Sequence, residues 1–140
     1  MGKINWGRVF LCGMLTAIVW YLLSSLLLAF LGKESVAVLF AASPPTYPEN
    51  MRGFYAFRWT TTLATGIWAM WLYAAIRPRY GPGPKTAAVA GFAWWAIRVL
   101  SDFFWGALGL IPLGVLLVPL AAFLLAHIAA VVLGAWPYEE

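Results

Sequence analysis

Residues 113–135 read LGVLLVPLAAFLLAHIAAVVLGA, a stretch without a single charged side chain. About 20 helical residues cross the ~30 Å hydrocarbon core of a bilayer, so this stretch is typical of a transmembrane helix. Three further apolar segments of similar length lie at residues 9–31, 54–76 and 86–108. Backbone groups in lipid must pair within the protein, and these segments are far longer than barrel strands. The sequence therefore predicts an all-α membrane protein, a single bundle of four transmembrane helices over residues 1–140.

The composition excludes the two main alternatives to a membrane protein. The chain of 140 residues is 64% hydrophobic and 10% charged, and its mean hydropathy is +0.84. A soluble domain carries roughly a quarter charged residues, and a disordered chain lacks apolar ones. The net charge of +4 does not indicate nucleic-acid binding, because the basic residues lie at the ends of apolar segments. The expected partners are membrane lipids, together with other membrane subunits or further copies of this chain.

The distribution of basic residues predicts the orientation of the bundle. The N-terminal region and the connection at residues 77–85 lie on one side, and the connection at residues 32–53 lies on the other. The first side carries Lys3, Arg8, Arg77, Arg79 and Lys85, and the second carries Lys33 and Arg52. Lysine and arginine are enriched in cytoplasmic loops, so both termini are expected in the cytoplasm.

Helix-breaking residues mark the connections between the segments. Residues 77–85, RPRYGPGPK, predict a stiff basic turn that follows a helix ending at residue 76. Residues 109–112, GLIP, carry no charge and predict a tight hairpin between the third and fourth helices. Tryptophan is enriched at membrane interfaces, and four of the nine tryptophans fall at the predicted boundaries: Trp6, Trp20, Trp59 and Trp136.

Three charged residues fall inside the predicted spans: Arg58, Arg98 and Asp102. A charge at the bilayer centre costs a few kcal/mol, so each of the three needs a partner or water. Asp102 lies one helical turn from Arg98 on the same face, at the spacing of an i,i+4 ion pair. Arg58 enters the membrane from the same outer side and can reach the depth of Asp102. The three residues form either a structural ion pair that fixes helix packing, or a surplus positive charge that attracts an anionic headgroup, a partner's carboxylate or an anionic ligand.

The only histidine, His127, lies inside the fourth segment. A lone imidazole in a helical bundle can be the axial ligand of a haem iron or of a chlorophyll magnesium, and Trp94 and Trp95 are expected at a similar depth. The alternative is a neutral histidine that is hydrogen-bonded to a backbone carbonyl or to a neighbouring helix.

Two further patterns concern helix packing. The fourth segment has small residues at a spacing of four: Ala122, Ala126, Ala130 and Gly134. Such a ridge allows close approach of another helix, either within the bundle or in a second subunit. The second segment carries Thr61, Thr62 and Thr65 on one face, where their hydroxyls can line a water path or bond back to their own helix.

The sequence contains no arrangement typical of an enzyme. Cys12 is the single cysteine, and it has no partner for a disulfide or a metal site. A Gly-rich phosphate loop, a Cys/His metal cluster and a Ser–His–Asp set are all missing. We therefore expect no catalytic residues and no metal site.

The start of the chain, Ile4-Asn5-Trp6-Gly7-Arg8-Val9, precedes a Gly- and Ala-containing helix that ends near Trp20-Tyr21. This region resembles the start of small bacterial four-helix membrane proteins of unknown function. The resemblance covers the first helix and the general layout, and it implies a multi-pass protein of the bacterial inner membrane.

Together these features predict a non-catalytic accessory subunit of a larger membrane complex, of respiratory or photosynthetic type. One alternative is a pigment- or haem-binding subunit that uses His127. Another is a small oligomeric transporter or channel with Arg58, Arg98 and Asp102 in its path.

Overall fold

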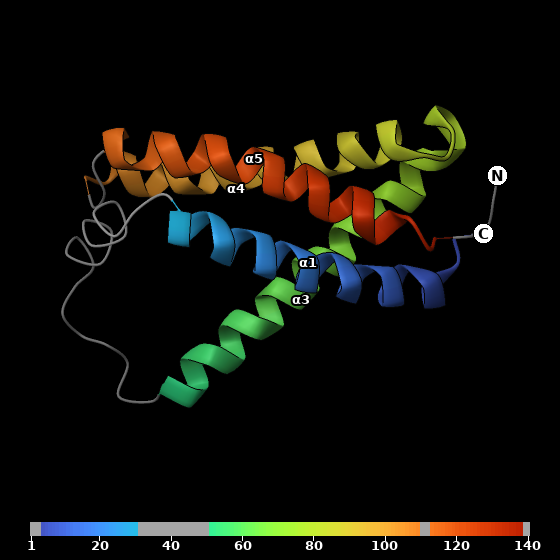
Figure 1. Ribbon diagram of the computed structural model, residues 1–140, viewed down its shortest axis with the longest axis horizontal. Helices are drawn as coiled ribbons and strands as arrows, with labels where there is room; N and C mark the ends of the chain where they lie inside the picture. Colours follow the sequence, from blue (N-terminus) through green and yellow to red (C-terminus); the bar gives the residue numbers. More distant parts are fainter. Residues whose placement is uncertain (1–3, 31–50, 110–112, 139–140) are drawn as a thin grey trace.

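The computed structural model describes residues 4–30, 51–109 and 113–138, and this part of the chain is helical apart from short turns and ends (Figure 1). It holds four helices: α1 (Trp6–Phe30), α3 (Met51–Tyr80), α4 (Pro84–Ala107) and α5 (Leu113–Ala135). These are the four segments that the sequence assigns to helices, so the predicted all-α fold is confirmed. The hairpin residues 110–112, most of the connection at residues 32–53, and Lys3 and Lys33 lie outside the described residues.

Two of the helices are long and apolar enough to cross a membrane. By length and composition these are α1 and the Pro84–Phe104 part of α4. The apolar part of α5, Pro119–Ala135, is shorter. The second helix in chain order, α3, has arginines near both of its ends and Arg58 within it.

The boundary between α3 and α4 differs from the prediction. The second helix does not end at residue 76, because α3 continues through Pro78 to Tyr80. Pro78 lies in the last turn, where its missing N–H removes only one hydrogen bond, and the Gly81 N–H closes the turn by donating to the Arg77 carbonyl at 2.8 Å. Helix α4 then starts at Pro84, a first-turn position at which no intrahelical N–H bond is lost.

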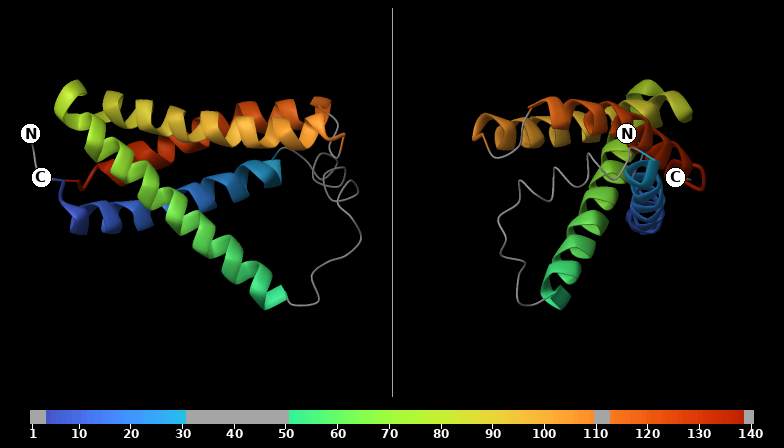
Figure 2. Two further views of the ribbon diagram at one scale, coloured as in Figure 1. Left: turned by 180° about the vertical axis from the view of Figure 1, so that it is seen from behind. Right: turned by 60° about the vertical axis from the view of Figure 1, so that its left-hand side comes forward.

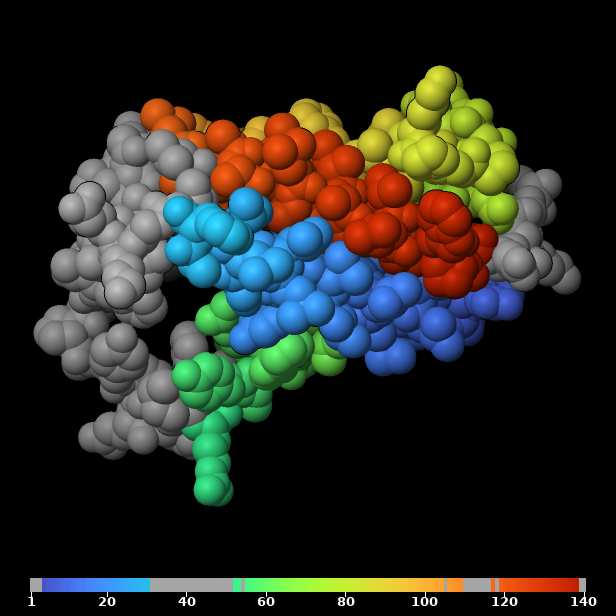
Figure 3. Space-filling model, viewed as in Figure 1, coloured from blue at the N-terminus to red at the C-terminus, as the bar shows by residue number. Residues whose placement is uncertain are grey.

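Helices α1, α4 and α5 lie together as a bundle, and α3 crosses it obliquely. Helix α1 packs against α3 and α5, and α4 packs against α5. Figures 1 and 2 show that α3 crosses α1 obliquely and that its N-terminal half leaves the other helices. In the space-filling view, α1 and α5 touch along their length while the start of α3 projects beyond them (Figure 3). One end of the bundle holds the start of α1, the α3–α4 turn and the end of α5.

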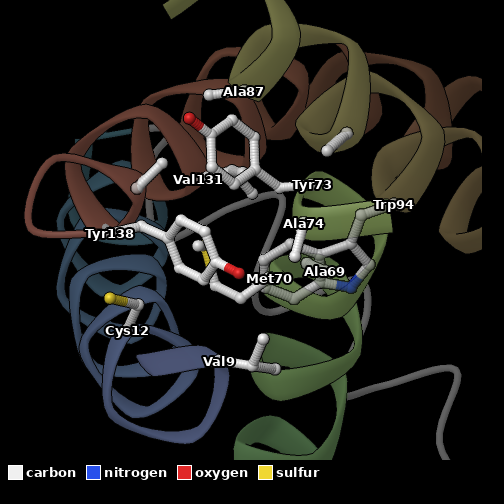
Figure 4. Packing of buried hydrophobic residues seen from close by; sticks show 12 residues of the cluster. Val9, Cys12, Ala69, Met70, Tyr73, Ala74, Ala87, Trp94, Val131 and Tyr138 are labelled. Carbon is white, nitrogen blue, oxygen red and sulfur yellow. The ribbon is translucent and has the colours of Figure 1, made fainter. Parts of the chain in front are cut away.

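The hydrophobic core lies towards that end of the bundle (Figure 4). Met70 and Tyr73 of α3 pack in it with Trp94 of α4, and the ring of Tyr138 meets Tyr73 edge to face, with ring centres 5.6 Å apart. Arg77 lies over the Tyr138 ring, with its guanidinium carbon 5.4 Å from the ring centre. Arg8 of α1 donates a hydrogen bond to the Pro137 carbonyl at 3.2 Å. The chain after α5 is therefore tied to the start of α1 and to the end of α3.

Glycines allow the helix backbones to approach closely where the helices cross. At the α1–α3 crossing, a Cβ on Gly13 would lie 2.5 Å from the Ile67 Cα, and one on Gly66 would lie 2.6 Å from the Gly13 carbonyl oxygen. At the α4–α5 contact, a Cβ on Gly91 would lie 2.8 Å from the Ile128 Cα. Since real Cβ atoms essentially never come this close to backbone, only glycine fits these positions.

The small-residue ridge of α5 is used within the chain. A Cβ on Gly134 would collide with the side chain of Thr16 on α1. Ala126 and Ala130 are buried, and Ala122 is half-buried. The sequence leaves the partner of this ridge open, and at Gly134 the partner is α1 of the same chain.

We expect Gly66→Ala to lower the free energy of unfolding by about 1–3 kcal/mol, the usual cost of overpacking a close contact. The measurement is reversible unfolding of the purified protein in mixed micelles. Gly7→Ala is the matched control in α1, because a Cβ at Gly7 would meet only the Asn5 Oδ1 atom, at an ordinary contact distance of 3.6 Å. Alanine is the better helix former by up to about 1 kcal/mol, so the control should be neutral or stabilising. Equal stability of the two variants would contradict the close crossing.

Candidate functional site

Polar side chains from all four helices line one cavity of about 200 Å³, which we call the four-helix cavity. Its lining residues are Trp20 of α1, Thr61, Thr62 and Thr65 of α3, Trp94 and Arg98 of α4, and His127 of α5. The sequence singled out most of these residues separately, as a charge cluster, a threonine face and a lone histidine. The fold brings them together around a single space.

Arg98 and Asp102 form the ion pair that their spacing predicts. The Arg98 Nε donates to both carboxylate oxygens, at 3.1 and 2.9 Å. The side chains are 44% and 19% exposed, so the pair lies at the edge of the cavity. Because both bonds use Nε, the two terminal guanidinium nitrogens form no hydrogen bond among the described residues, and they are available to a ligand.

Arg58 does not join this pair. Its guanidinium carbon lies 5.6 Å from the centre of the Tyr21 ring on α1, a cation–π arrangement. Tyr21 also packs against Trp59, with ring centres 4.5 Å apart. Within the described part of the chain the predicted cluster is therefore an Arg98–Asp102 pair and a separate cation held on an aromatic ring.

His127 forms the inner wall of the cavity and is 1% exposed. Its Nδ1 lies 2.7 Å from the Phe123 carbonyl oxygen. A carbonyl only accepts, so Nδ1 carries the hydrogen, and in a neutral ring Nε2 is then the acceptor nitrogen. The edge of the Trp94 ring system meets the imidazole at 4.7 Å. This is the backbone-bonded arrangement that the sequence offers as the alternative to an axial ligand.

The size of the cavity bears on the pigment alternative. An apolar cavity of about 150 Å³ holds one benzene molecule. At about 200 Å³ the four-helix cavity accommodates a single substituted ring. A tetrapyrrole bound to His127 would require the helices to move apart.

Trp20 has a position inside the bundle that the sequence does not predict. It is assigned to the membrane interface, yet it packs inside the bundle against Trp94 and His127, with ring centres 5.7 and 5.4 Å away. Its indole Nε1 is buried and has no hydrogen-bond partner among the described residues. The other three predicted interface tryptophans are exposed: Trp6, Trp59 and Trp136. The signal that could have placed Trp20 is its spacing, because it lies four residues from each of the buried polar residues Thr16 and Ser24.

The three threonines of the cavity bond back to their own helix. Thr61 and Thr62 donate to the Arg58 carbonyl at 2.9 and 2.8 Å, and Thr65 donates to the Thr61 carbonyl at 2.9 Å. Each hydroxyl hydrogen is therefore in use, and the oxygen lone pairs are what α3 offers to the cavity. The cavity thus presents acceptors at α3 and α5, and donors at Trp20 and Arg98.

Trp95 links α4 to α5 next to the cavity residue Trp94. Its indole Nε1 donates to the Leu120 carbonyl at 2.8 Å, which links α4 to α5. Leu120 follows Pro119, which lacks an N–H and so interrupts the regular hydrogen bonding of α5. This cross-helix bond holds the neighbouring Trp94 in register with α5.

No protein-family model, curated protein or solved structure matches the chain. What the protein does is therefore inferred from its residues and their geometry.

Replacing Asp102 with Asn leaves the Arg98 charge without its carboxylate. We expect a loss of about 1–3 kcal/mol in the free energy of unfolding in bicelles, because an unsatisfied charged group costs at least this much in a low dielectric. The double variant Arg98→Met with Asp102→Leu removes both charges and should recover most of the loss. Arg79→Met, an exposed position at the end of α3, is the control for loss of a cation. Equal losses in the single and double variants would contradict a stabilising pair.

Proposed function

We propose that the chain is a multi-pass protein of the bacterial inner membrane with both termini in the cytoplasm, and that it serves as a non-catalytic accessory subunit of a larger membrane complex of respiratory or photosynthetic type. Two apolar helices of spanning length support the membrane location. The other two helices run through the same bundle, which supports four spans.

The placement of basic residues supports the orientation. The start of α1, the α3–α4 turn and the end of α5 lie at one end of the bundle (Figure 1). Arg8, Arg77, Arg79 and Lys85 belong to these segments. By the positive-inside rule, this end faces the cytoplasm.

The exposed N-terminal part of α3 carries the proposal of a partner subunit. Residues 52, 53 and 55–61 are all exposed, and this part of α3 lies away from the other described helices. Among them Phe57 is 71% exposed, and Arg58 rests on a single tyrosine ring. A cation on a helix surrounded by lipid is costly. Helices of another subunit, with a carboxylate or carbonyl for Arg58, would remove that cost.

The contacts of the other helices also favour the N-terminal part of α3 as the partner surface. The α5 ridge contacts α1 at Gly134, so this end of the ridge is not free for another chain. Several of the polar groups around the cavity bond within their own helix: His127 to Phe123, Arg98 to Asp102, and the threonines to α3 carbonyls. Such pairings hold side chains in fixed positions, which supports a structural role.

Labelling of single cysteines tests the orientation. In a Cys12→Ala background, we expect a membrane-impermeant maleimide added to intact cells to modify Leu108→Cys at the end of α4, and to leave Lys85→Cys at its start unmodified. Both positions are exposed, so both should react after permeabilisation. Modification of Lys85→Cys in intact cells, or equal reactivity of the two, would contradict cytoplasmic termini.

A photo-reactive amino acid tests the partner surface. We expect position 57 on α3 to cross-link to another membrane protein in the native membrane, and position 125 on α5 to cross-link to lipid alone. Phe57 and Leu125 are matched, because each is 71% exposed. Arg58→Leu should reduce co-purification of that partner several-fold. A chain that purifies in mild detergent as a monomer, with no cross-link from position 57, would refute the subunit proposal; cross-links to its own copies would show a homo-oligomer instead.

A further inference from the structure

The four-helix cavity combines unused donors with unused acceptors inside an aromatic frame. The donors carried by its lining residues are the indole N–H of Trp20, which is enclosed by protein atoms and has no hydrogen-bond partner among the described residues, and the terminal nitrogens of Arg98. The acceptors are Nε2 of His127 and the hydroxyl oxygens of the three α3 threonines, since their hydrogens are already used. The indole rings of Trp20 and Trp94, 5.7 Å apart at their centres, supply flat apolar walls. A buried N–H without a partner is unfavourable, so the site is suited to a guest that accepts hydrogen bonds.

The charge balance selects a neutral guest over an anion. Asp102 receives both of its hydrogen bonds from Arg98, so the guanidinium charge is compensated at the edge of the cavity. His127 is buried and presents an acceptor nitrogen, which repels an anion rather than attracting one.

The size of the cavity limits the guest to one ring. The cavity has a volume of about 200 Å³, and a cavity of ~150 Å³ holds one benzene molecule. The difference leaves room for a few substituent atoms on the ring. The same space would hold about six or seven water molecules at ~30 Å³ each. A ligand would enter the cavity beside Arg98, whose side chain is 44% exposed, because the buried His127 closes the inner side.

We propose that the four-helix cavity binds the ring of a neutral, lipid-soluble quinone or quinol. A ring carbonyl accepts hydrogen bonds from the Trp20 indole and the Arg98 guanidinium. In the reduced form, a ring hydroxyl donates to His127 Nε2 or to a threonine oxygen. An apolar tail leaves past Arg98 into the surrounding lipid. This binding does not depend on the partner at α3, which lies on a different surface.

Equilibrium dialysis of the purified full-length chain in detergent micelles tests the proposal, with a short-tailed benzoquinone as the probe and empty micelles as the blank. We expect saturable binding of one quinone per chain. Trp20→Phe keeps the aromatic wall and removes one donor, so it should weaken binding about three- to tenfold. Trp71→Phe, an exposed indole outside the cavity, should leave the affinity unchanged.

Analogue ligands keep the test decisive even where Trp20→Phe disturbs folding. A probe with the same ring and tail but no oxygen atoms should bind at least tenfold more weakly than the quinone to the wild-type chain. A short-chain phosphatidylglycerol should not compete. Binding no greater than in empty micelles would mean that the cavity holds water only. That result, equal affinity of the oxygen-free analogue, full competition by the anionic lipid, or an unchanged affinity in a folded Trp20→Phe variant would each overturn the proposal.

Discussion

The close approach of helix backbones at glycines is the constraint on which the structure depends. Lipid tails are as apolar as leucine, so membrane helices gain little by hiding apolar side chains from one another and must associate through close packing. In this chain, Gly13 and Gly66 bring α1 onto α3, Gly91 brings α4 onto α5, and Gly134 brings α5 onto α1. These contacts connect all four helices in one path, with α1 and α5 at its centre.

The four-helix cavity follows from where those contacts lie. Trp20 is seven residues from Gly13, His127 is seven from Gly134, and Arg98 is seven from Gly91. Thr62 is four residues from Gly66. Separations of four and seven return to the same helix face, so each of these side chains projects on the face that the glycine packs. Since α1 and α4 run opposite to α3 and α5, all four displacements lead towards the same end of the bundle. Helix α3 diverges from the others beyond its crossing with α1, and the larger polar and aromatic residues lie at the side where it diverges.

The sequence predicts where the helices lie and which residues pair within a helix, but not which way each helix faces. The reason is physical. Length and hydropathy define the helices, because crossing lipid requires a fixed number of apolar residues. The Arg98–Asp102 pair follows from a spacing within one helix. The interior position of Trp20 and the stacking of Arg58 on Tyr21 depend on which way each helix faces. In a membrane helix both the lipid side and the protein side are apolar, so the periodic contrast that orients a helix in a soluble protein is weak. The position of a residue along its helix can therefore be read from the sequence, and the rotation of the helix about its axis cannot.

The hydrogen bonds of the site bear on how such a polar cavity can form in lipid. The partners of Thr61, Thr62, Thr65, Arg98 and His127 all lie three or four residues away on the same helix. Each helix can thus form with these groups already paired, before it meets its neighbours. Trp20 differs, because its indole becomes enclosed by Trp94 and His127 only when α1, α4 and α5 are together. The enclosure of this donor is therefore a product of helix assembly rather than a property of α1 alone.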